Sequence, residues 1–330
     1  MKETSQQNST TLLTRRSLLV AGGLSLCSFA SGAEAAVTPP RFVKQWGRRG
    51  KGEGEFDILI AIAINRKDEL FVTEFRNNRV QKFDTEGRFL ATIPVGEYPG
   101  GIAVDREGRI YVAHMMSGII GVYDEKGAKL HEFGGMGREP GQFEQPGGIA
   151  VANSGTLYIT DQVNRRVQHF TAEGKFLRMW GEYGVEPGQF GGNENRANRT
   201  GGPQFVAVDR HDNVYTTEGS VGRVQKFTPE GDYILSWGDN GTQPGGFGGR
   251  ARNLPGPIAI TLDRRGRVWV SATNHWVQEF TADGKYLQRI GGAGDQPGQF
   301  KTPHGMVFDS KGHLYVCDSQ NARVQKFAVT

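Results

Sequence analysis

Four carboxylates in this 330-residue chain each precede an arginine by five residues. The pairs are Glu74 and Arg79, Asp161 and Arg166, Glu218 and Arg223, and Asp318 and Arg323. The planar guanidinium of arginine suits a two-pronged bond to a carboxylate. Because each acid has an arginine of its own, the spacing favours four structural ion pairs that fix a chain connection. The alternative is a ring of carboxylates that binds a cation.

Two segments at corresponding positions lack this pair and carry histidines. The first contains His114, Met115, Met116 and Ile119, and the second contains Ala272, Asn274, His275 and Trp276. If the two segments lie opposite each other in a ring, they form an apolar, histidine-bearing ligand surface. The alternative is ordinary drift between repeats.

A five-residue phrase recurs and defines the elements that position these side chains. It reads Arg79–Phe83, Arg166–Phe170, Arg223–Phe227, Trp276–Phe280 and Arg323–Phe327, with a weaker copy at Ile119–Tyr123. From closing aromatic to closing aromatic, the steps are 40, 47, 57, 53 and 47 residues. Six copies at this spacing predict six small units, each stacked on its neighbours to bury an apolar face.

Each unit reads as four short strands. In the third unit they are expected at residues 148–151, 156–160, 166–170 and 175–180, separated by Gly, Asn, Asp and Glu turns. Turn glycines such as Gly87 and Gly174 follow an acidic residue, where a tight connection needs positive φ. The expected fold class is all-β, a six-bladed β-propeller of four-stranded antiparallel blades.

The two ends of the chain complement each other. The sixth unit ends soon after Phe327 without a fourth strand, whereas residues 41–46 resemble a fourth strand without a unit of its own. We therefore expect the N-terminal strand to complete the last blade, which removes the open edges of a linear stack. Residues 37–330 are predicted to form a single domain.

The repeated pattern Gly-Ile-Ala-Val, Ile/Leu-Tyr-Val, Arg-Val-Gln-Lys-Phe, Trp-Gly and Pro-Gly-Gln-Phe resembles the NHL repeat. This resemblance implies a six-bladed NHL propeller. It implies no single function, because relatives include scaffolds, RNA-binding domains and a few lyases.

Related peptidyl-hydroxyglycine amidating lyases hold zinc with three histidines at strand entrances. Here only His304 occupies such an entrance, and a catalytic zinc requires three protein ligands. We therefore predict no catalytic residue, no metal ligand and no cofactor, with a divalent metal left open. The preferred function is a binding or scaffold protein acting through its loop-rich face. The alternative is a metal-assisted lyase or lactonase-type hydrolase at the channel mouth near His304.

Two long connections carry arginines amid Gly and Asn. They are Arg196 and Arg199 in one, and Arg250 and Arg252 in the other. Long loops on a rigid scaffold often carry function, so we add these residues to His304, His114, His275 and Trp276 as candidates for the ligand face. The expected partner is a protein, peptide or glycan. Nucleic acid is not expected, because the exposed aromatic ladder used for single strands is missing.

The first 35 residues resemble a twin-arginine export signal. Arg15 and Arg16 precede a short apolar stretch, and Ala33-Glu34-Ala35 provides a cleavage site. The stretch is too short to span a membrane. Export to a bacterial periplasm or beyond is therefore expected, with lipid attachment at Cys27 as the disfavoured alternative.

Charge and cysteine content add two limits. The formal net charge of +4 is too small to require nucleic acid or an anionic membrane as a partner. After cleavage, Cys317 is the only cysteine, so no internal disulfide can form. We expect a monomer in which Cys317 fills a small packing position.

Overall fold

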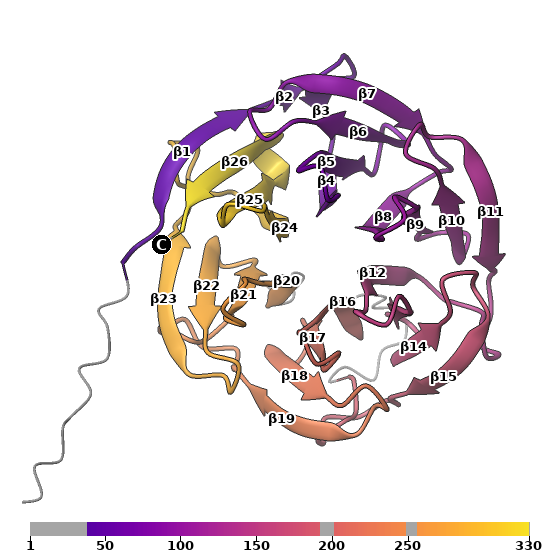
Figure 1. Ribbon diagram of the computed structural model, residues 1–330. Helices are drawn as coiled ribbons and strands as arrows, with labels where there is room; N and C mark the ends of the chain where they lie inside the picture. Colours follow the sequence, from indigo (N-terminus) through magenta and orange to yellow (C-terminus); the bar gives the residue numbers. More distant parts are fainter. Residues whose placement is uncertain (1–37, 192–200, 249–255, 330) are drawn as a thin grey trace, which may run out of the picture. The chain divides into compact units, whose positions relative to one another are not determined.

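The computed structural model describes residues 38–191, 201–248 and 256–329, and residues 37–330 form one compact unit. Six four-stranded antiparallel sheets follow one another around a ring (Figure 1). The innermost strands are β4 (Leu59–Ile64), β8 (Pro99–Val104), β12 (Pro146–Val151), β16 (Pro203–Val208), β20 (Pro257–Leu262) and β24 (Pro303–Phe308). Each of these strands contacts the innermost strand of the next blade, including β24 with β4.

The remaining strands complete each blade outward. The second strands are β5 (Leu70–Glu74), β9 (Ile110–His114), β13 (Leu157–Asp161), β17 (Val214–Glu218), β21 (Val268–Ala272) and β25 (His313–Asp318). The third strands are β6 (Arg79–Phe83), β10 (Ile119–Tyr123), β14 (Arg166–Phe170), β18 (Arg223–Phe227), β22 (Trp276–Phe280) and β26 (Arg323–Ala328). The outer strands are β7 (Phe89–Pro94), β11 (Lys129–Gly134), β15 (Phe176–Trp180), β19 (Tyr233–Trp237), β23 (Tyr286–Gly291) and, for the sixth blade, β1 (Arg41–Trp46).

The predicted closure of the ring is confirmed. Strand β1 pairs antiparallel with β26, and Phe42 lies opposite Phe327 (Figure 1). A register irregularity between Phe42 and Lys44 interrupts the pairing. Two minor elements were not predicted, the short parallel pair of β2 (Arg48–Arg49) and β3 (Glu55–Phe56) and a 3₁₀ turn at Ser319–Asn321.

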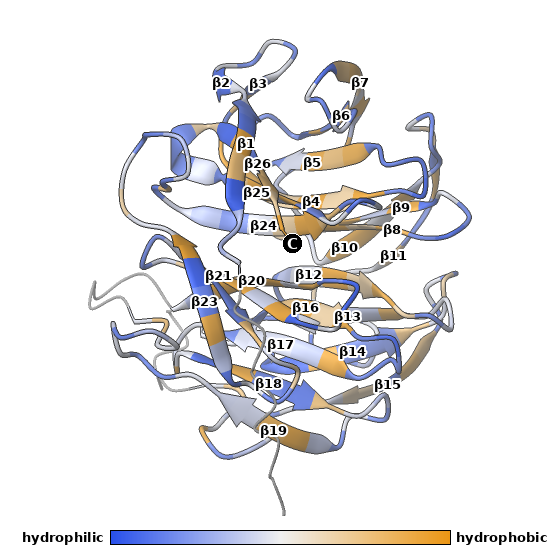
Figure 2. Ribbon diagram, turned by 60° about the vertical axis from the view of Figure 1, so that its left-hand side comes forward, coloured by the Kyte–Doolittle hydropathy of each residue, from blue (hydrophilic) through white to orange (hydrophobic). Residues whose placement is uncertain are grey.

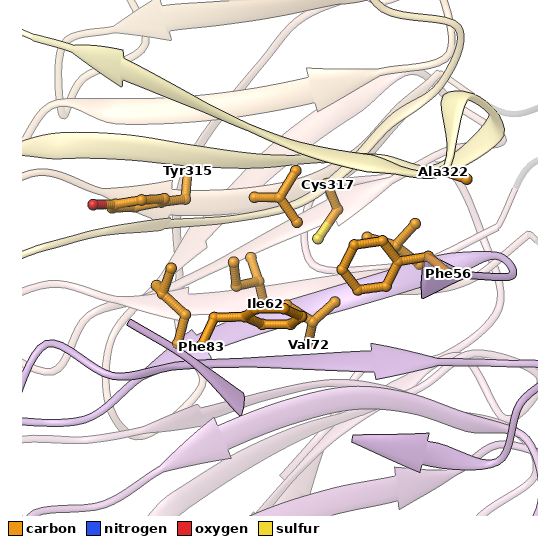
Figure 3. Close-up of a cluster of buried hydrophobic side chains, with 10 residues drawn as sticks. Phe56, Ile62, Val72, Phe83, Tyr315, Cys317 and Ala322 are labelled. Carbon is orange, nitrogen blue, oxygen red and sulfur yellow. The ribbon is translucent and has the colours of Figure 1, made fainter. Parts of the chain in front are cut away.

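The hydrophobic core lies between the blades. Six apolar clusters each combine residues of two neighbouring blades, because the second and third strands are buried on both faces. Figure 3 shows the cluster at the ring-closing joint, where Ile62, Val72 and Phe83 of the first blade and Phe56 of the connection before it meet Tyr315 and Cys317 of the sixth. Outer strands such as β23 carry both hydrophilic and hydrophobic residues (Figure 2), because one face meets solvent.

Five of these joints each contain a buried phenylalanine from the connecting segment, where it ends a Gly-Gln-Phe phrase or a variant of it. Phe143, for example, is fully buried with its ring centroid 5.5 Å from that of Phe170. The equivalent pairs are Phe56 with Phe83, Phe190 with Phe227, Phe247 with Phe280 and Phe300 with Phe327. The inter-blade connection is therefore anchored in the core, which holds the neighbouring loops in place.

Candidate functional site

The four predicted acid–arginine pairs are ion pairs in the structure. Their N···O distances are 2.6 Å for Arg79–Glu74, 3.0 Å for Arg166–Asp161, 2.7 Å for Arg223–Glu218 and 2.9 Å for Arg323–Asp318. All four carboxylates are buried. Desolvation raises the pKa of Asp161 and of Glu218, against the opposing effect of the adjacent arginine.

Each of these arginines also fixes the connection that enters its blade. Arg166 donates to the carbonyls of Arg138, Glu139 and Gln142, at 2.7, 3.1 and 2.8 Å. The glutamine of the repeated phrase has a similar role, since Gln168 Nε2 donates to Gln142 O at 2.7 Å. Sequence reasoning missed this glutamine, although it recurs in five copies. The acids and arginines are therefore engaged in structural contacts that hold the blades and their connections together.

The histidine of the second blade is buried, which favours drift between repeats over the exposed ligand surface, the other alternative that the sequence left open. His114 is only 5% exposed, with Nδ1 3.4 Å from Glu97 O and Nε2 3.5 Å from Tyr123 Oη. Burial lowers its pKa. It occupies the position of the missing acid at the end of β9 and packs within its own blade.

In the fifth blade, His275 and Trp276 have separate local contacts. His275 Nδ1 donates to Lys301 O at 2.7 Å, and the Arg289 guanidinium lies 4.1 Å from the Trp276 ring centroid. Neither of these contacts involves His114. The two irregular segments are therefore not brought together by any of these contacts.

His304 joins two blades across the ring closure. Its Nδ1 donates to Ile60 O at 2.7 Å, and its ring meets Phe205 edge-on at 5.6 Å between centroids. A carbonyl can only accept, so Nδ1 carries the proton of the neutral ring. Burial lowers the pKa of His304 to about 4.

The central channel is narrowed beside this histidine. His304 belongs to the sixth blade and Phe205 to the fourth, so their contact crosses the channel. A hollow of about 280 Å³ lies along the inner strands and is lined by small and aliphatic residues such as Ala61, Ala150 and Met306. It shares Ile64, Val104, Val151 and Leu262 with a hollow of about 550 Å³ at the turns that follow the innermost strands. The channel therefore continues toward the face that carries the turns after the innermost strands. We had expected the channel mouth on the opposite face, near His304.

A separate pocket of about 690 Å³ lies on the third blade, on the face that carries the inter-blade connections. The start of β14, the end of β15 and the segment after β15 build it. Its lining residues are Arg138, Val163, Asn164, Arg165, Arg166, Met179, Trp180, Gly181, Glu182 and Tyr183. This size is typical of small-molecule sites, and the lining combines apolar surface with a few polar groups.

Arg165 stands out in this pocket. It is 7% exposed, its Nη1 is buried without a hydrogen-bond partner, and no ion pair to it is found among the described residues. Its guanidinium carbon lies 5.9 Å from the Tyr183 ring centroid. Burial lowers the pKa of Arg165, and Glu218 and Tyr183 oppose that shift. Such a buried, unpaired cation is costly to the fold.

Sequence reasoning missed Arg165 and Tyr183. The feature that could have identified Arg165 is its position directly before the third strand, where the backbone φ is positive in all six blades. It is Asn78, Gly118, Arg165, Gly222, His275 and Ala322 in order. Glycine and asparagine tolerate this conformation, whereas a long side chain there is unusual. Detecting the departure required the dihedral angles, which the sequence does not state.

The candidate arginines Arg196, Arg199, Arg250 and Arg252 lie outside the described residues, as do the signal segment and Cys27. Within the described ranges, no three His, Cys, Asp or Glu side chains are grouped to hold a metal ion. The same part of the chain contains no helix long and apolar enough to cross a membrane.

Comparison with known proteins gives the following likenesses. A family model of the NHL repeat matches residues 143–170 and 300–327, which lie in the third and sixth blades. A Bacteroides thetaiotaomicron protein of unknown function aligns at 18% identity and TM-score 0.67, over 88% of this chain and 76% of that one.

Two enzymes share the fold at similar distance. A gluconolactonase from Xanthomonas campestris aligns at 16% identity and TM-score 0.60, over 89% of this chain and 95% of its own. Virginiamycin B lyase from Staphylococcus aureus aligns at 15% identity and TM-score 0.57, over 87% and 95% respectively. At these identities the likeness concerns the fold alone.

Proposed function

Since the chain is an NHL-repeat β-propeller, we propose that it is an exported binding protein that recognises its ligand in the pocket on the third blade. One observation carries this proposal: the pocket of about 690 Å³ contains a buried, unpartnered arginine. Natural folds retain such a group mainly where it serves a ligand or another charge. The ligand belongs to a protein, peptide or glycan partner, or is a small molecule.

The rigidity of the surrounding scaffold supports this proposal. Arg166 ties β14 to the connection through residues 138–142, and Phe190 anchors the connection that follows β15 by packing on Phe227. A pocket formed between two anchored connections needs little reorganisation to bind. Preorganisation of this kind lowers the cost of association.

Catalysis at the channel mouth has less support. The fold neighbours include a gluconolactonase and a virginiamycin B lyase, which keeps a hydrolase or lyase as the alternative. However, the Nδ1–H of His304 is committed to Ile60 O, and its ring packs against Phe205. A histidine with a pKa of about 4 is also a poor general base at neutral pH.

The proposal includes export because the N-terminal segment resembles a twin-arginine signal. Arg15 and Arg16 precede an apolar stretch and an Ala-x-Ala site. Replacing both arginines by lysine is expected to leave the unprocessed precursor in the cytoplasm of a bacterium with twin-arginine transport, as judged by fractionation and immunoblotting. Processing and export of this variant at the normal rate would contradict a twin-arginine route.

A fragment screen tests recognition by the pocket. Met179 and Leu177 are each 42% exposed on β15, but only Met179 lines the pocket. We expect a mixed-charge fragment library to yield compounds that raise the melting temperature of the wild type and Leu177→Trp. These compounds should not stabilise Met179→Trp, in which the larger ring fills the pocket. The proposal fails if no fragment binds or if binding is insensitive to Met179→Trp.

A further inference from the structure

The backbone of Arg165 has a conformation that residues with a side chain disfavour. Its φ is +60°, at a position where the second and fourth blades have Gly118 and Gly222. A non-glycine residue in this region costs stability and persists where the surroundings or a function require it. Arg165 therefore combines local backbone strain with the burial of an unpaired charge.

The neighbouring groups do not neutralise Arg165. Glu218 affects it electrostatically, but its oxygens accept hydrogen bonds from Arg223 Nε and Gly191 N, each at 2.7 Å. Glu182, the only carboxylate among the described residues that line the pocket, accepts from Gln189 Nε2 at 2.9 Å. Neither of these two acids forms a hydrogen bond or ion pair with Arg165.

Among the described lining residues, the cations of the pocket exceed the carboxylates: Arg138, Arg165 and Arg166 line it, against Glu182. Arg166 is paired with Asp161, and Arg138 lies 3.7 Å from Glu144, so Arg165 is the lining cation that has no ion-pair partner in the described part of the chain. Gly201 packs closely against it, since a Cβ there would lie 2.3 Å from Arg165 Nη1. A side chain at position 201 would therefore clash with the guanidinium.

The rest of the lining offers apolar and aromatic surface. Met179 and Val163 are aliphatic, and Tyr183 lies beside the guanidinium. An arginine next to such a surface recognises a planar anion attached to an apolar group, because the anion accepts the two-pronged bond and the apolar part covers the side chains.

We propose that this pocket binds a carboxylate attached to an apolar group, with Arg165 as the residue that recognises the carboxylate. The inference rests on the proposed function and adds its ligand class. The carboxylate comes either from a free organic acid or from the C-terminus of a peptide, and both present the same chemistry to Arg165.

Matched probe pairs test the charge of the ligand. The probes are 3-phenylpropionate and 3-phenylpropanamide, together with N-acetyl-glycyl-phenylalanine and its C-terminal amide. We measure affinity by calorimetry or saturation-transfer NMR at neutral pH, where the carboxylates are ionised. At least one acid should bind about tenfold or more tightly than its amide, as expected for a charge-assisted hydrogen bond. The acid that binds better identifies the source of the carboxylate.

Two glycine variants distinguish the loss of ligand recognition from the relief of backbone strain. Arg165→Gly and His275→Gly replace residues at the same positive-φ position of different blades. Both should keep the fold, with an unchanged or raised melting temperature for Arg165→Gly and a slightly lowered one for His275→Gly, which also loses the hydrogen bond to Lys301 O. Only Arg165→Gly should abolish the preference for the acid over the amide, whereas Met179→Trp should remove binding of both.

The outcomes distinguish the two proposals. Equal binding of acid and amide, or an acid preference that survives Arg165→Gly, overturns the carboxylate assignment. Lack of binding by all four probes overturns it as well. If the mixed-charge screen still finds ligands that depend on Met179, the pocket keeps its proposed function with a different ligand class.

Discussion

One residue position on the second strand links four of the six blades to the next blade, and it explains His304. The second blade has Ala113 at this position, which has no side-chain donor. Thr73, Thr160, Thr217 and Ser271 donate from the second strand to a carbonyl on the innermost strand of the following blade. The acceptors are Gly100, Gln204, Ile258 and His304, at 2.8, 2.8, 2.6 and 2.8 Å. The sixth blade has Cys317 instead, whose thiol is a weak donor. There the equivalent carbonyl, Ile60 O, accepts from His304.

His304 therefore replaces a missing hydroxyl at the ring-closing joint, and a double-mutant cycle tests this role. His304→Ala should destabilise the protein by about 1–2 kcal/mol, because Ile60 O loses its donor. Cys317→Thr should restore part of that loss by supplying the hydroxyl. Chemical denaturation of the two single variants and the double variant gives the coupling free energy. Strict additivity would contradict the role.

The depressed pKa of His304 makes stability depend on pH. The folded protein keeps this ring neutral down to about pH 4, whereas an ordinary histidine titrates near 6.5. Between these values the unfolded chain binds more protons, so the free energy of unfolding falls as pH falls, by up to about 3 kcal/mol. Above this window the contribution is fully present.

Unfolding measurements across that range should show a shallower loss of stability in His304→Ala than in the wild type. His114 and His169 also have pKa values lowered by burial and act in the same direction, so the comparison between variants is the informative one. Identical slopes for both proteins would show that His304 is not held neutral by the fold.

The buried acid–arginine pairs should contribute more to the free energy of unfolding than exposed surface pairs do. Arg166→Met leaves Asp161 buried without its cation and removes the donor to three carbonyls. We expect a loss of about 3 kcal/mol or more. Arg88→Met is the control, because its pair with Asp84 has an arginine side chain that is 81% exposed. That change should cost below about 1 kcal/mol, and similar losses for both variants would contradict the account.

At the residue scale, repetition decided what the sequence could predict. The five-residue spacing from acid to arginine predicts a local pair because each acid has its own partner. The repeat pattern gave no indication that Arg165 is a candidate ligand-binding residue. Only its positive φ and its buried, unpartnered Nη1 distinguish it from its neighbour Arg166. For His114 the departure from the repeat was compatible with a surface role or with drift, and only the structure shows that the residue fills a buried position.

At the scale of elements, the N-terminal strand closes the ring. Trp46 at the end of β1 reaches over the first blade, with ring centroids 6.2 Å from Phe83 and 6.1 Å from Tyr315. It also covers Gly87, whose φ is +77° and where a Cβ would lie 2.6 Å from the indole. The missing fourth strand of the last blade made this pairing predictable. The short β2–β3 pair has no such signal in its residues.

Removal of this indole should loosen the closure. Trp46→Ala is expected to lower the free energy of unfolding by about 2 kcal/mol, a value below that of a fully buried tryptophan because Trp46 is half-buried. Val43→Ala on the same strand should cost below about 0.5 kcal/mol, since Val43 is 39% exposed. Urea unfolding measures both, and a small effect of Trp46→Ala would mean that β1 contributes little to closure.

At the scale of the whole molecule, the fold was predictable and the position of the site was not. Six copies of one phrase predict six blades, and the ring follows from burying apolar faces between them. The position of an opening depends on which side chains meet across the axis. The contact of Phe205 with His304 narrows the channel on the expected face, and neither residue indicates this from its place in the sequence.

A ligand-bound crystal structure tests the central claim most directly. The protein would be crystallised with the tightest-binding fragment from the mixed-charge screen. We predict ligand density in the pocket of the third blade, between Met179 and Tyr183 and against the Arg165 guanidinium. Density in the central channel beneath Phe205, with the third-blade pocket empty, would contradict the account.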